Sequence, residues 1–268
     1  STLDLSGYDH FMAMPNLGVF KDAGFPFTRL ADLSETAVVL PDNAGAPELD
    51  AYLTVLGRFG QSTGYPATAV LVIQAAQIQA AADKDLLVLA SGANQPLLTQ
   101  WADQLPAAGN DGQQSFYLSD LPMRVRDWFS PDPEANQRKA RLALAFSGGQ
   151  PSTYLTGFES PLKSGRSVVV IASGKPAGLA DATNALIGGE DYSQSIQGSL
   201  VVVRGKTIEP LVADEQYYVG SLSPIKYLQW MLSRHVLLTM LLTVVGVLLP
   251  GWVTYLSLRS RAKPRLKA

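Results

Sequence analysis

The sequence predicts an α/β domain in residues 1–222, an amphipathic helix in residues 223–235 and a transmembrane helix in residues 236–258. Short apolar runs rich in Val, Leu and Ile alternate with stretches of helical periodicity, which is typical of an open, doubly wound and mostly parallel sheet. The 23 residues from Val236 to Leu258 contain no charged side chain. At a rise of about 1.5 Å per residue they reach roughly 34 Å as a helix, which is enough to cross a bilayer.

Several apolar runs are predicted as strands covered on both faces, because they are continuous rather than alternating. They are Thr36–Leu40, Ala69–Ile73, Leu86–Ala90, Val168–Ala172 and Leu200–Val203. One more strand is predicted at Thr153–Phe158, within a segment rich in Gly, Pro, Ser and Thr. Residues Arg124–Arg141 are charged and carry two prolines, so an exposed excursion is predicted there.

Three helices are predicted between these strands. The first begins at Pro47 and ends at Gly60. The second is capped by Asn94, and the third begins near Pro176 and ends at Gly188–Gly189. The first helix carries apolar residues at helical spacing, which are Leu49, Tyr52, Leu53, Leu56 and Phe59. The second is predicted to bury Leu97, Leu98, Trp101 and Leu105.

Two predicted strands end in the same Ala-Ser-Gly turn, at Ala90–Gly92 and Ala172–Gly174. Ligands bind at the carboxyl edge of open α/β sheets, and both turns are expected at that edge. A membrane-anchored sensor of sugars or nucleotides is therefore one hypothesis. The alternative interpretation is that small residues simply permit tight turns between a strand and a helix.

The segment before the apolar run is predicted to lie in the membrane interface. Ser223 caps it, and Pro224 occupies the first helical position. Tyr227 and Trp230 lie at the boundaries between the two faces, where amphipathic rings favour the headgroup region. The apolar face is formed by Ile225, Leu228, Met231 and Leu232, opposite Lys226, Gln229 and Ser233. The alternative is that this segment merely continues the transmembrane helix.

Small and weakly polar residues recur at intervals of three and four along the transmembrane run. They are Thr239, Thr243, Gly246, Pro250, Thr254 and Ser257. Small residues allow helices to approach closely in lipid, so this stripe predicts packing against a partner helix. Pro250 is expected to kink the helix. The ten residues 259–268 hold five basic and no acidic side chains, which places this tail in the cytoplasm and the domain on the other side of the membrane.

Composition and motifs predict no catalytic, cofactor or metal site. There is no cysteine and there are only two histidines, and residues 1–258 carry 16 basic against 23 acidic side chains, which argues against nucleic acid. The segment Gly60–Gly64 fits the G-x-S-x-G elbow of hydrolases, but a helix precedes it and a strand follows, the reverse of what the motif needs. Arg29, Asp32 and Glu35 are interpreted as a salt-bridged loop that holds the first strand rather than as an acid/base group.

Three motifs resemble the B subunit of bacterial cellulose synthase. They are Asp9–Leu17 (DHFMAMPNL), Gly24–Pro41 (GFPFTRLADLSETAVVLP) and Leu56–Pro66 (LGRFGQSTGYP). The order of elements also matches, from the α/β domain to the short basic tail. The resemblance implies that the chain is the second flavodoxin-like domain and the anchor of that subunit, with residues 1–8 as the end of a preceding domain or linker.

The family implies a non-catalytic accessory subunit in the bacterial inner membrane, with a periplasmic domain and a cytoplasmic C-terminus. Its partners are the catalytic synthase subunit, which uses UDP-glucose and is activated by cyclic di-GMP, and inner-membrane lipid. The family contacts nascent cellulose through outer domains, and the upstream carbohydrate-binding domains are missing from this sequence, which is interpreted as the C-terminal piece of a longer precursor. Self-association is left open.

Overall fold

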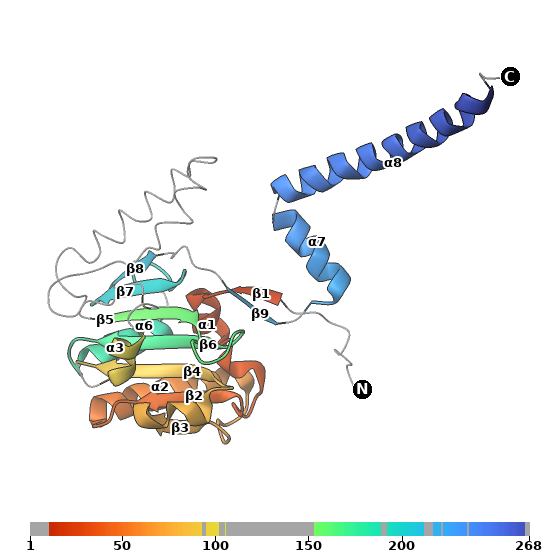
Figure 1. The fold of residues 1–268 in the computed structure, drawn as a ribbon. Helices are drawn as coiled ribbons and strands as arrows, with labels where there is room; N and C mark the ends of the chain where they lie inside the picture. Colours follow the sequence, from red (N-terminus) through yellow and green to blue (C-terminus); the bar gives the residue numbers. More distant parts are fainter. Residues whose placement is uncertain are drawn as a thin grey trace. The chain divides into compact units, whose positions relative to one another are not determined.

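The computed structural model describes residues 11–92, 95–101, 105, 153–188, 192–211, 217–220, 222–234 and 236–265. The described chain divides into two compact units (Figure 1). One unit is Met12–Val219, and the other contains Phe11 together with the C-terminal residues from Gly220.

The unit Met12–Val219 contains two sheets and the helices around them, except that Phe11 of β1 and Gly220 of β9 belong to the other unit. The strands are β1 (Phe11–Met14), β2 (Thr36–Leu40), β3 (Leu71–Gln74), β4 (Asp85–Ser91), β5 (Thr153–Glu159), β6 (Ser167–Ser173), β7 (Leu200–Arg204), β8 (Thr207–Leu211) and β9 (Tyr217–Gly220). The α-helices are α1 (Leu17–Ala23), α2 (Ala46–Thr63), α3 (Pro96–Gln100) and α6 (Gly178–Ile187), and the 3₁₀ helices are η1 (Phe27–Arg29) and η2 (Ala75–Ala81).

The main sheet has seven strands in the order β3-β2-β4-β6-β5-β7-β8, and β1 pairs with β9 in a separate ribbon (Figure 1). Strands β3, β2, β4 and β6 are parallel, whereas β5 is antiparallel to both of its neighbours and β8 is antiparallel to β7. The α/β class is confirmed, but the sheet is mixed rather than mostly parallel. Only seven residues, 160–166, separate β5 from β6, which is too short for a parallel crossover.

Helices cover both faces of the sheet. An apolar core of buried side chains lies between the sheet and the helices on each face. The core beneath α1, α2 and α6 includes Phe20, Phe59 and Leu179. The core beneath η2 and α3 includes Ile78 and Leu97, and the Trp101 ring packs edge-on against Phe158 in it. Strands buried on both faces explain why the apolar runs are continuous.

The six predicted strands are all confirmed, with ends shifted by no more than two residues. Strands β1, β8 and β9 were not predicted from the sequence. The edge strand β8 contains Pro210, which has no N–H to donate. A proline within a run argues against a strand from sequence alone, although edge strands tolerate it. A turn with Gly205 at φ 60° connects β8 to β7.

The predicted helices are present with different limits. The first, α2, continues three residues beyond Gly60 to Thr63, and Gly64 ends it in the left-handed conformation. Of the apolar residues at helical spacing, Leu49 and Leu53 are 45% and 64% exposed. Their spacing of four places both on the outer face of α2.

The other two helices are shorter than expected. The helix α3 begins at Pro96 after Gln95, whose side chain makes no cap hydrogen bond. The proposed cap Asn94 and the segment Arg124–Arg141 lie outside the described residues. Helix α6 begins at Gly178, two residues after Pro176, and Gly188 ends it.

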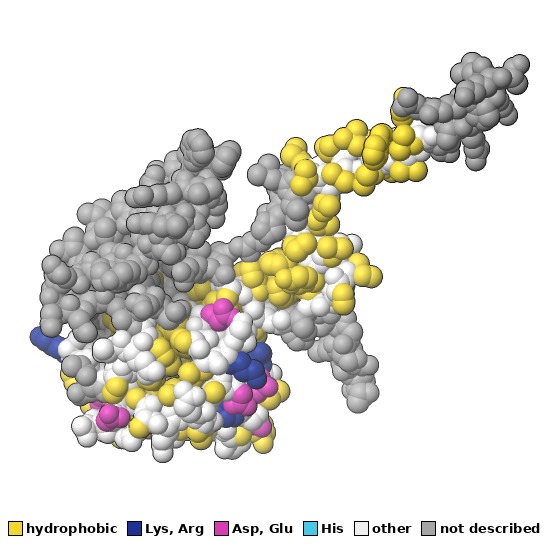
Figure 2. All heavy atoms as spheres, viewed as in Figure 1, with side chains coloured by type: hydrophobic (Ala, Val, Ile, Leu, Met, Phe, Trp, Pro, Cys, Tyr) yellow, Lys and Arg dark blue, Asp and Glu magenta, His cyan; other side chains and the backbone are white. Residues whose placement is uncertain are grey.

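The second unit contains α7 (Pro224–Arg234) and α8 (Val236–Arg265). Residues Thr239–Leu256 of α8 are long and apolar enough to cross a membrane, and none of them is buried. Figure 2 shows the apolar side chains exposed along both helices. The described part of the chain therefore has one helix that qualifies as a span.

Two glycines test the packing of the helices at the first core. Gly24 ends α1 at φ 71°, and a Cβ there would lie 2.7 Å from the buried Phe59 ring. Gly24→Ala is expected to destabilise the domain by roughly 2–3 kcal/mol, because strain and overpacking add. Gly57→Ala, where a Cβ meets nothing within 4 Å, is expected to stabilise it by about 0.5–1 kcal/mol. Urea unfolding of the full chain in micelles, followed by circular dichroism, measures both, and equal effects would contradict this packing.

Candidate functional site

The two Ala-Ser-Gly turns lie side by side at the carboxyl edge of the parallel strands. Strands β4 and β6 are paired in register through Ala90 with Ala172 and Ser91 with Ser173. The amide of Gly92 donates a hydrogen bond of 2.8 Å to the carbonyl of Ser173. The prediction that both turns meet at this edge is confirmed.

The serine hydroxyls of these turns bind neighbouring protein groups. The Ser91 hydroxyl donates to the carboxylate of Glu48, and that carboxylate also accepts the amide of Gly45 at 2.8 Å. Burial raises the pKa of Glu48, but the hydrogen bonds from Ser91 and the backbone outweigh it, so the pKa lies below its usual value. The ionised carboxylate therefore stabilises the first turn of α2 and ties that helix to β4.

The second turn is closed in the same way. The hydroxyls of Thr153 and Ser173 are 3.1 Å apart, and the Ser173 hydroxyl accepts the amide of Lys175 at 3.3 Å. A Cβ on Gly178 would lie 2.1 Å from the Ser173 hydroxyl oxygen, which shows how closely α6 approaches the strand. These contacts support the interpretation of the turns as tight strand-to-helix connections.

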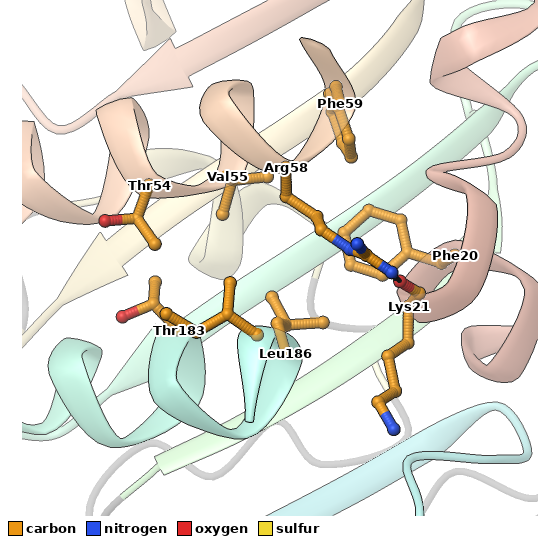
Figure 3. A pocket seen from close by; sticks show the side chains of 9 residues that line it. Phe20, Lys21, Thr54, Val55, Arg58, Phe59, Thr183 and Leu186 are labelled. Carbon is orange, nitrogen blue, oxygen red and sulfur yellow. Dashed lines mark hydrogen bonds between the residues drawn. The ribbon is translucent and has the colours of Figure 1, made fainter. Parts of the chain in front are cut away.

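The hollow between α1, α2 and α6 is small (Figure 3). It encloses about 10 Å³, which is room for roughly one water molecule. Arg58 lies over it and donates to the carbonyls of Lys21 and Asp22 at 3.1–3.4 Å. Its guanidinium therefore supplies hydrogen bonds to carbonyls in the last turn of α1 that have no donor within the helix. Small-molecule pockets are typically 300–1,000 Å³ in volume. This hollow does not accommodate a sugar or a nucleotide.

Charged side chains gather at the opposite, amino edge of the parallel strands. Asp85 begins β4, and its buried carboxylate is paired with Arg29 and, at 3.3 Å, with Arg166. Glu35 lies 2.9 Å from Arg166 and 3.5 Å from Arg29. We call these four residues the amino-edge cluster.

The predicted salt-bridged loop is therefore right for Arg29 and Glu35 and wrong for Asp32. The Asp32 carboxylate accepts the amide and hydroxyl of Ser34 instead, at 3.1 and 2.9 Å, and these bonds lower its pKa. Asp85 and Arg166 were missed, although each stands directly at the start of a continuous apolar strand. An acidic residue at the start of one apolar run and a basic residue just before another could have indicated the ion pair between Asp85 and Arg166.

The surroundings of Asp85 indicate a structural role. Burial raises the pKa of the Asp85 carboxyl, and the Ser167 amide, which donates to it at 2.8 Å, acts in the opposite direction together with the two arginines. Ligands of open α/β sheets bind at the carboxyl edge, whereas this cluster lies at the amino edge. Its charges compensate one another, and it joins β2, β4 and β6.

The elbow-like segment Gly60–Gly64 does not form a nucleophile elbow. Ser62 lies in the last turn of α2, so a helix precedes it, as the sequence indicated. Among the described residues, no group of three His, Asp or Glu side chains is arranged to hold a metal ion.

The predicted interfacial residues lie on α7. Ile225 is 73% exposed, and Tyr227 and Leu228 are about half exposed, so part of the apolar face is open to the surroundings. Trp230 packs edge-on against Phe11 at a centroid distance of 5.0 Å and at a tilt against Tyr227 at 5.6 Å. Met231 and Leu232 are partly buried. The structure confirms the helix, and its place in a membrane interface stays a prediction.

The predicted stripe lies on α8, and its hydroxyls bond within this unit. Thr239 donates to the carbonyl of Leu232 in α7, Thr243 to that of Thr239 at 2.8 Å, and Thr254 to that of Pro250 at 2.6 Å. A Cβ on Gly246 would meet nothing within 4 Å. The stripe therefore offers methyl groups and bare backbone, and its packing against a partner stays a prediction.

A family model described as "Cellulose synthase BcsB, second FD domain" matches residues 10–171, more than half of the chain. The chain belongs to the cellulose synthase BcsB family. The match extends from β1 into β6, so it covers the parallel half of the main sheet.

Curated relatives align with almost the whole chain. One, named "Cyclic di-GMP-binding protein", from Pseudomonas fluorescens (strain SBW25), is 63% identical over 266 residues, which are 99% of this chain and 35% of the relative. A protein of the same name from Komagataeibacter xylinus is 33% identical over 256 residues, 93% of this chain and 31% of the relative. "Cellulose synthase 1" of Komagataeibacter xylinus is 30% identical over 276 residues, all of this chain and 17% of the relative. The chain thus spans about a third or less of the length of these relatives.

The amino-edge cluster gives a stability prediction. Asp85→Asn removes the only fully buried charge of the cluster and leaves both arginines with a single carboxylate, so a loss of roughly 3 kcal/mol or more is expected. The matched control is Glu209→Gln, which breaks the exposed pair with Arg204 at 3.4 Å and is expected to cost less than about 1 kcal/mol. Urea unfolding compares the two, and a small effect of Asp85→Asn would contradict a structural role.

Glu35 gives a pH prediction. The hydrogen bond from Arg166, aided by the charges of Arg166, Arg29 and Lys84, holds the pKa of Glu35 below its usual value in the folded protein, although burial acts against it. The stabilisation is therefore complete above the unfolded pKa and is lost as the pH falls through the folded pKa. The difference in urea midpoint between wild type and Glu35→Gln should shrink below about pH 5. A difference that stays constant down to pH 3 would show that Glu35 is not stabilised in this way.

Proposed function

We propose that the chain is the membrane-anchoring C-terminal part of a non-catalytic accessory subunit of bacterial cellulose synthase. One observation carries the proposal. The relative named "Cellulose synthase 1" contains a region similar to the whole of this chain, yet the chain covers only 17% of it, against 35% of the relative from Pseudomonas fluorescens. The longer relative has about twice the length, which leaves room for a synthase in the same polypeptide. Joining two modules covalently raises their effective concentration, which benefits modules that act together.

The proposed organisation follows the predicted boundaries. Residues 1–222 form the periplasmic domain, 223–235 the interfacial helix, 236–258 the span and 259–268 the cytoplasmic tail. The basic tail supports this orientation in the bacterial inner membrane, because Lys and Arg beside a span remain in the cytoplasm. In this arrangement Trp252 and Tyr255 lie near the cytoplasmic interface, and Tyr227 and Trp230 near the periplasmic one.

For the domain itself we propose a flavodoxin-like, doubly wound origin. The first three parallel strands in chain order, β2, β3 and β4, lie in the spatial order 2-1-3. That order begins the 2-1-3-4-5 arrangement of flavodoxin-like sheets. The antiparallel strands β5, β7 and β8 extend the sheet beyond this pattern.

We place the partner surface on the stripe of α8. Thr243 and Thr254 donate their hydroxyls to their own helix, so neither needs a polar partner. Pro250 has no N–H, and the carbonyl of Gly246, four residues earlier, therefore lacks its usual helical donor. A backbone carbonyl without a donor is costly in hydrocarbon, and this favours protein rather than lipid beside Gly246. The proposed partner is a transmembrane helix of the catalytic subunit.

Cellulose and cyclic di-GMP are proposed to act elsewhere in the complex. The described carboxyl edge is closed by its own side chains, so we assign glucan contacts to upstream domains. The name "Cyclic di-GMP-binding protein" belongs to the relatives. In this chain the arginines of the amino-edge cluster are compensated by Asp85 and Glu35, and we propose that the catalytic subunit receives the dinucleotide.

A pair of substitutions in α8 tests the proposal. Gly246→Leu fills the stripe and is expected to lower glucan synthesis by the reconstituted synthase at least several-fold, because the helices can no longer approach. Val244→Leu adds bulk about 200° away around the helix and is expected to leave synthesis unchanged. Thermal unfolding of the domain should be the same in both variants. Equal synthesis by Gly246→Leu and wild type would rule out this packing surface.

A further inference from the structure

The chain leaves the domain through a strand that lies outside the main sheet. Strand β9 is the last strand before α7, and it pairs with β1 in a two-stranded ribbon (Figure 1). A ribbon of two strands is marginally stable on its own. The contacts between this ribbon and the rest of the domain therefore decide how firmly the chain is held just before α7.

Apolar contacts hold the ribbon only in part. Met14, Tyr217 and Val219 form a small buried cluster with Phe25 packed against it. This cluster is separate from the two large cores on the faces of the main sheet. Segments that share buried contacts tend to unfold together. A ribbon with its own small core is therefore able to open while the main sheet stays folded.

The Tyr217 side chain of β9 binds Ser167, which is next to Arg166 of the amino-edge cluster. The hydroxyl of Tyr217 donates to the hydroxyl of Ser167 at 2.7 Å, and both groups are buried. The amide of Ser167 in turn donates to the Asp85 carboxylate at 2.8 Å. Tyr217 is thus hydrogen-bonded to a buried hydroxyl whose own backbone amide binds Asp85, at a place where water cannot replace a lost partner.

We propose that the β1–β9 ribbon is a strap that opens as a unit, and that Tyr217 is the latch that keeps it closed. Opening leaves the seven-stranded sheet intact, because the ribbon contributes none of its strands. Release of the four residues Tyr217–Gly220 gives the chain before α7 about 13 Å of additional reach, at about 3.3 Å per residue. The strap thereby sets the length of free chain between the main sheet and α7. The inference rests on the domain geometry and not on the role proposed in cellulose synthesis.

Hydrogen exchange of the full chain in lipid nanodiscs tests the strap. In wild type, amides of β1 and β9 are expected to exchange together and faster than those of β4 and β6. Tyr217→Phe removes only the hydroxyl and is expected to speed exchange in both ribbon strands by about 3- to 10-fold, the effect of one lost hydrogen bond. Exchange in β4 and β6 should not change.

The matched control is Tyr154→Phe, which removes a hydroxyl from β5 within the main sheet. It is expected to leave exchange in the ribbon unchanged. Ser167→Ala removes the acceptor of the same bond, so adding it to Tyr217→Phe should speed exchange little further. The strap is overturned if β1 and β9 exchange at the rate of β4 and β6 in wild type. It is also overturned if Tyr217→Phe speeds exchange equally in all strands, or if Tyr154→Phe has the same effect on the ribbon.

Discussion

The buried carboxylate of Asp85 is the constraint on which much of the domain depends. A charge in this position is stable only if several donors surround it, and here Arg29, Arg166 and the amide of Ser167 do so. These donors come from segments before β2 and at the start of β6, so satisfying one carboxylate fixes the neighbours of β4. The Tyr217 hydroxyl then joins β9 to the side chain of Ser167, whose amide is one of these donors.

The opposite edge of the sheet is closed by a different set of contacts. At the carboxyl edge, Ser91 ties β4 to Glu48 at the start of α2, and Ser173 packs against Gly178 at the start of α6. An α/β sheet would ordinarily hold a ligand there, but these side chains bind one another. Fold class alone would therefore have suggested a sugar or nucleotide site that the described geometry does not support.

Among the described residues, many of the large exposed apolar side chains lie on α7 and α8. The hydroxyls of Thr243 and Thr254 bond within α8, and a Cβ on Gly246 would meet nothing within 4 Å, so the backbone is bare there. In lipid such a surface favours another helix. An accessory subunit of cellulose synthase would use it to hold its domain beside the enzyme.

The elements that sequence could predict were those specified by local pattern. Continuous apolar runs indicated the parallel strands, and an uncharged run followed by basic residues indicated α8. Features that depend on residues far apart in the sequence were harder to predict. Asp85 and Arg166 are 81 positions apart, the antiparallel course of β5 follows from a short loop, and the exposure of Leu53 follows from which face of α2 meets the sheet.

Crosslinking from α8 tests the accessory role most directly. The sequence contains no cysteine, so Gly246→Cys gives one attachment point in this chain for a photoreactive group, and Val244→Cys gives a matched point about 200° around the helix. In membranes that contain the whole synthase, the probe at position 246 is expected to capture the catalytic subunit much more than the probe at position 244. Equal capture from both positions, or capture of lipid alone from position 246, would contradict a synthase partner for this helix.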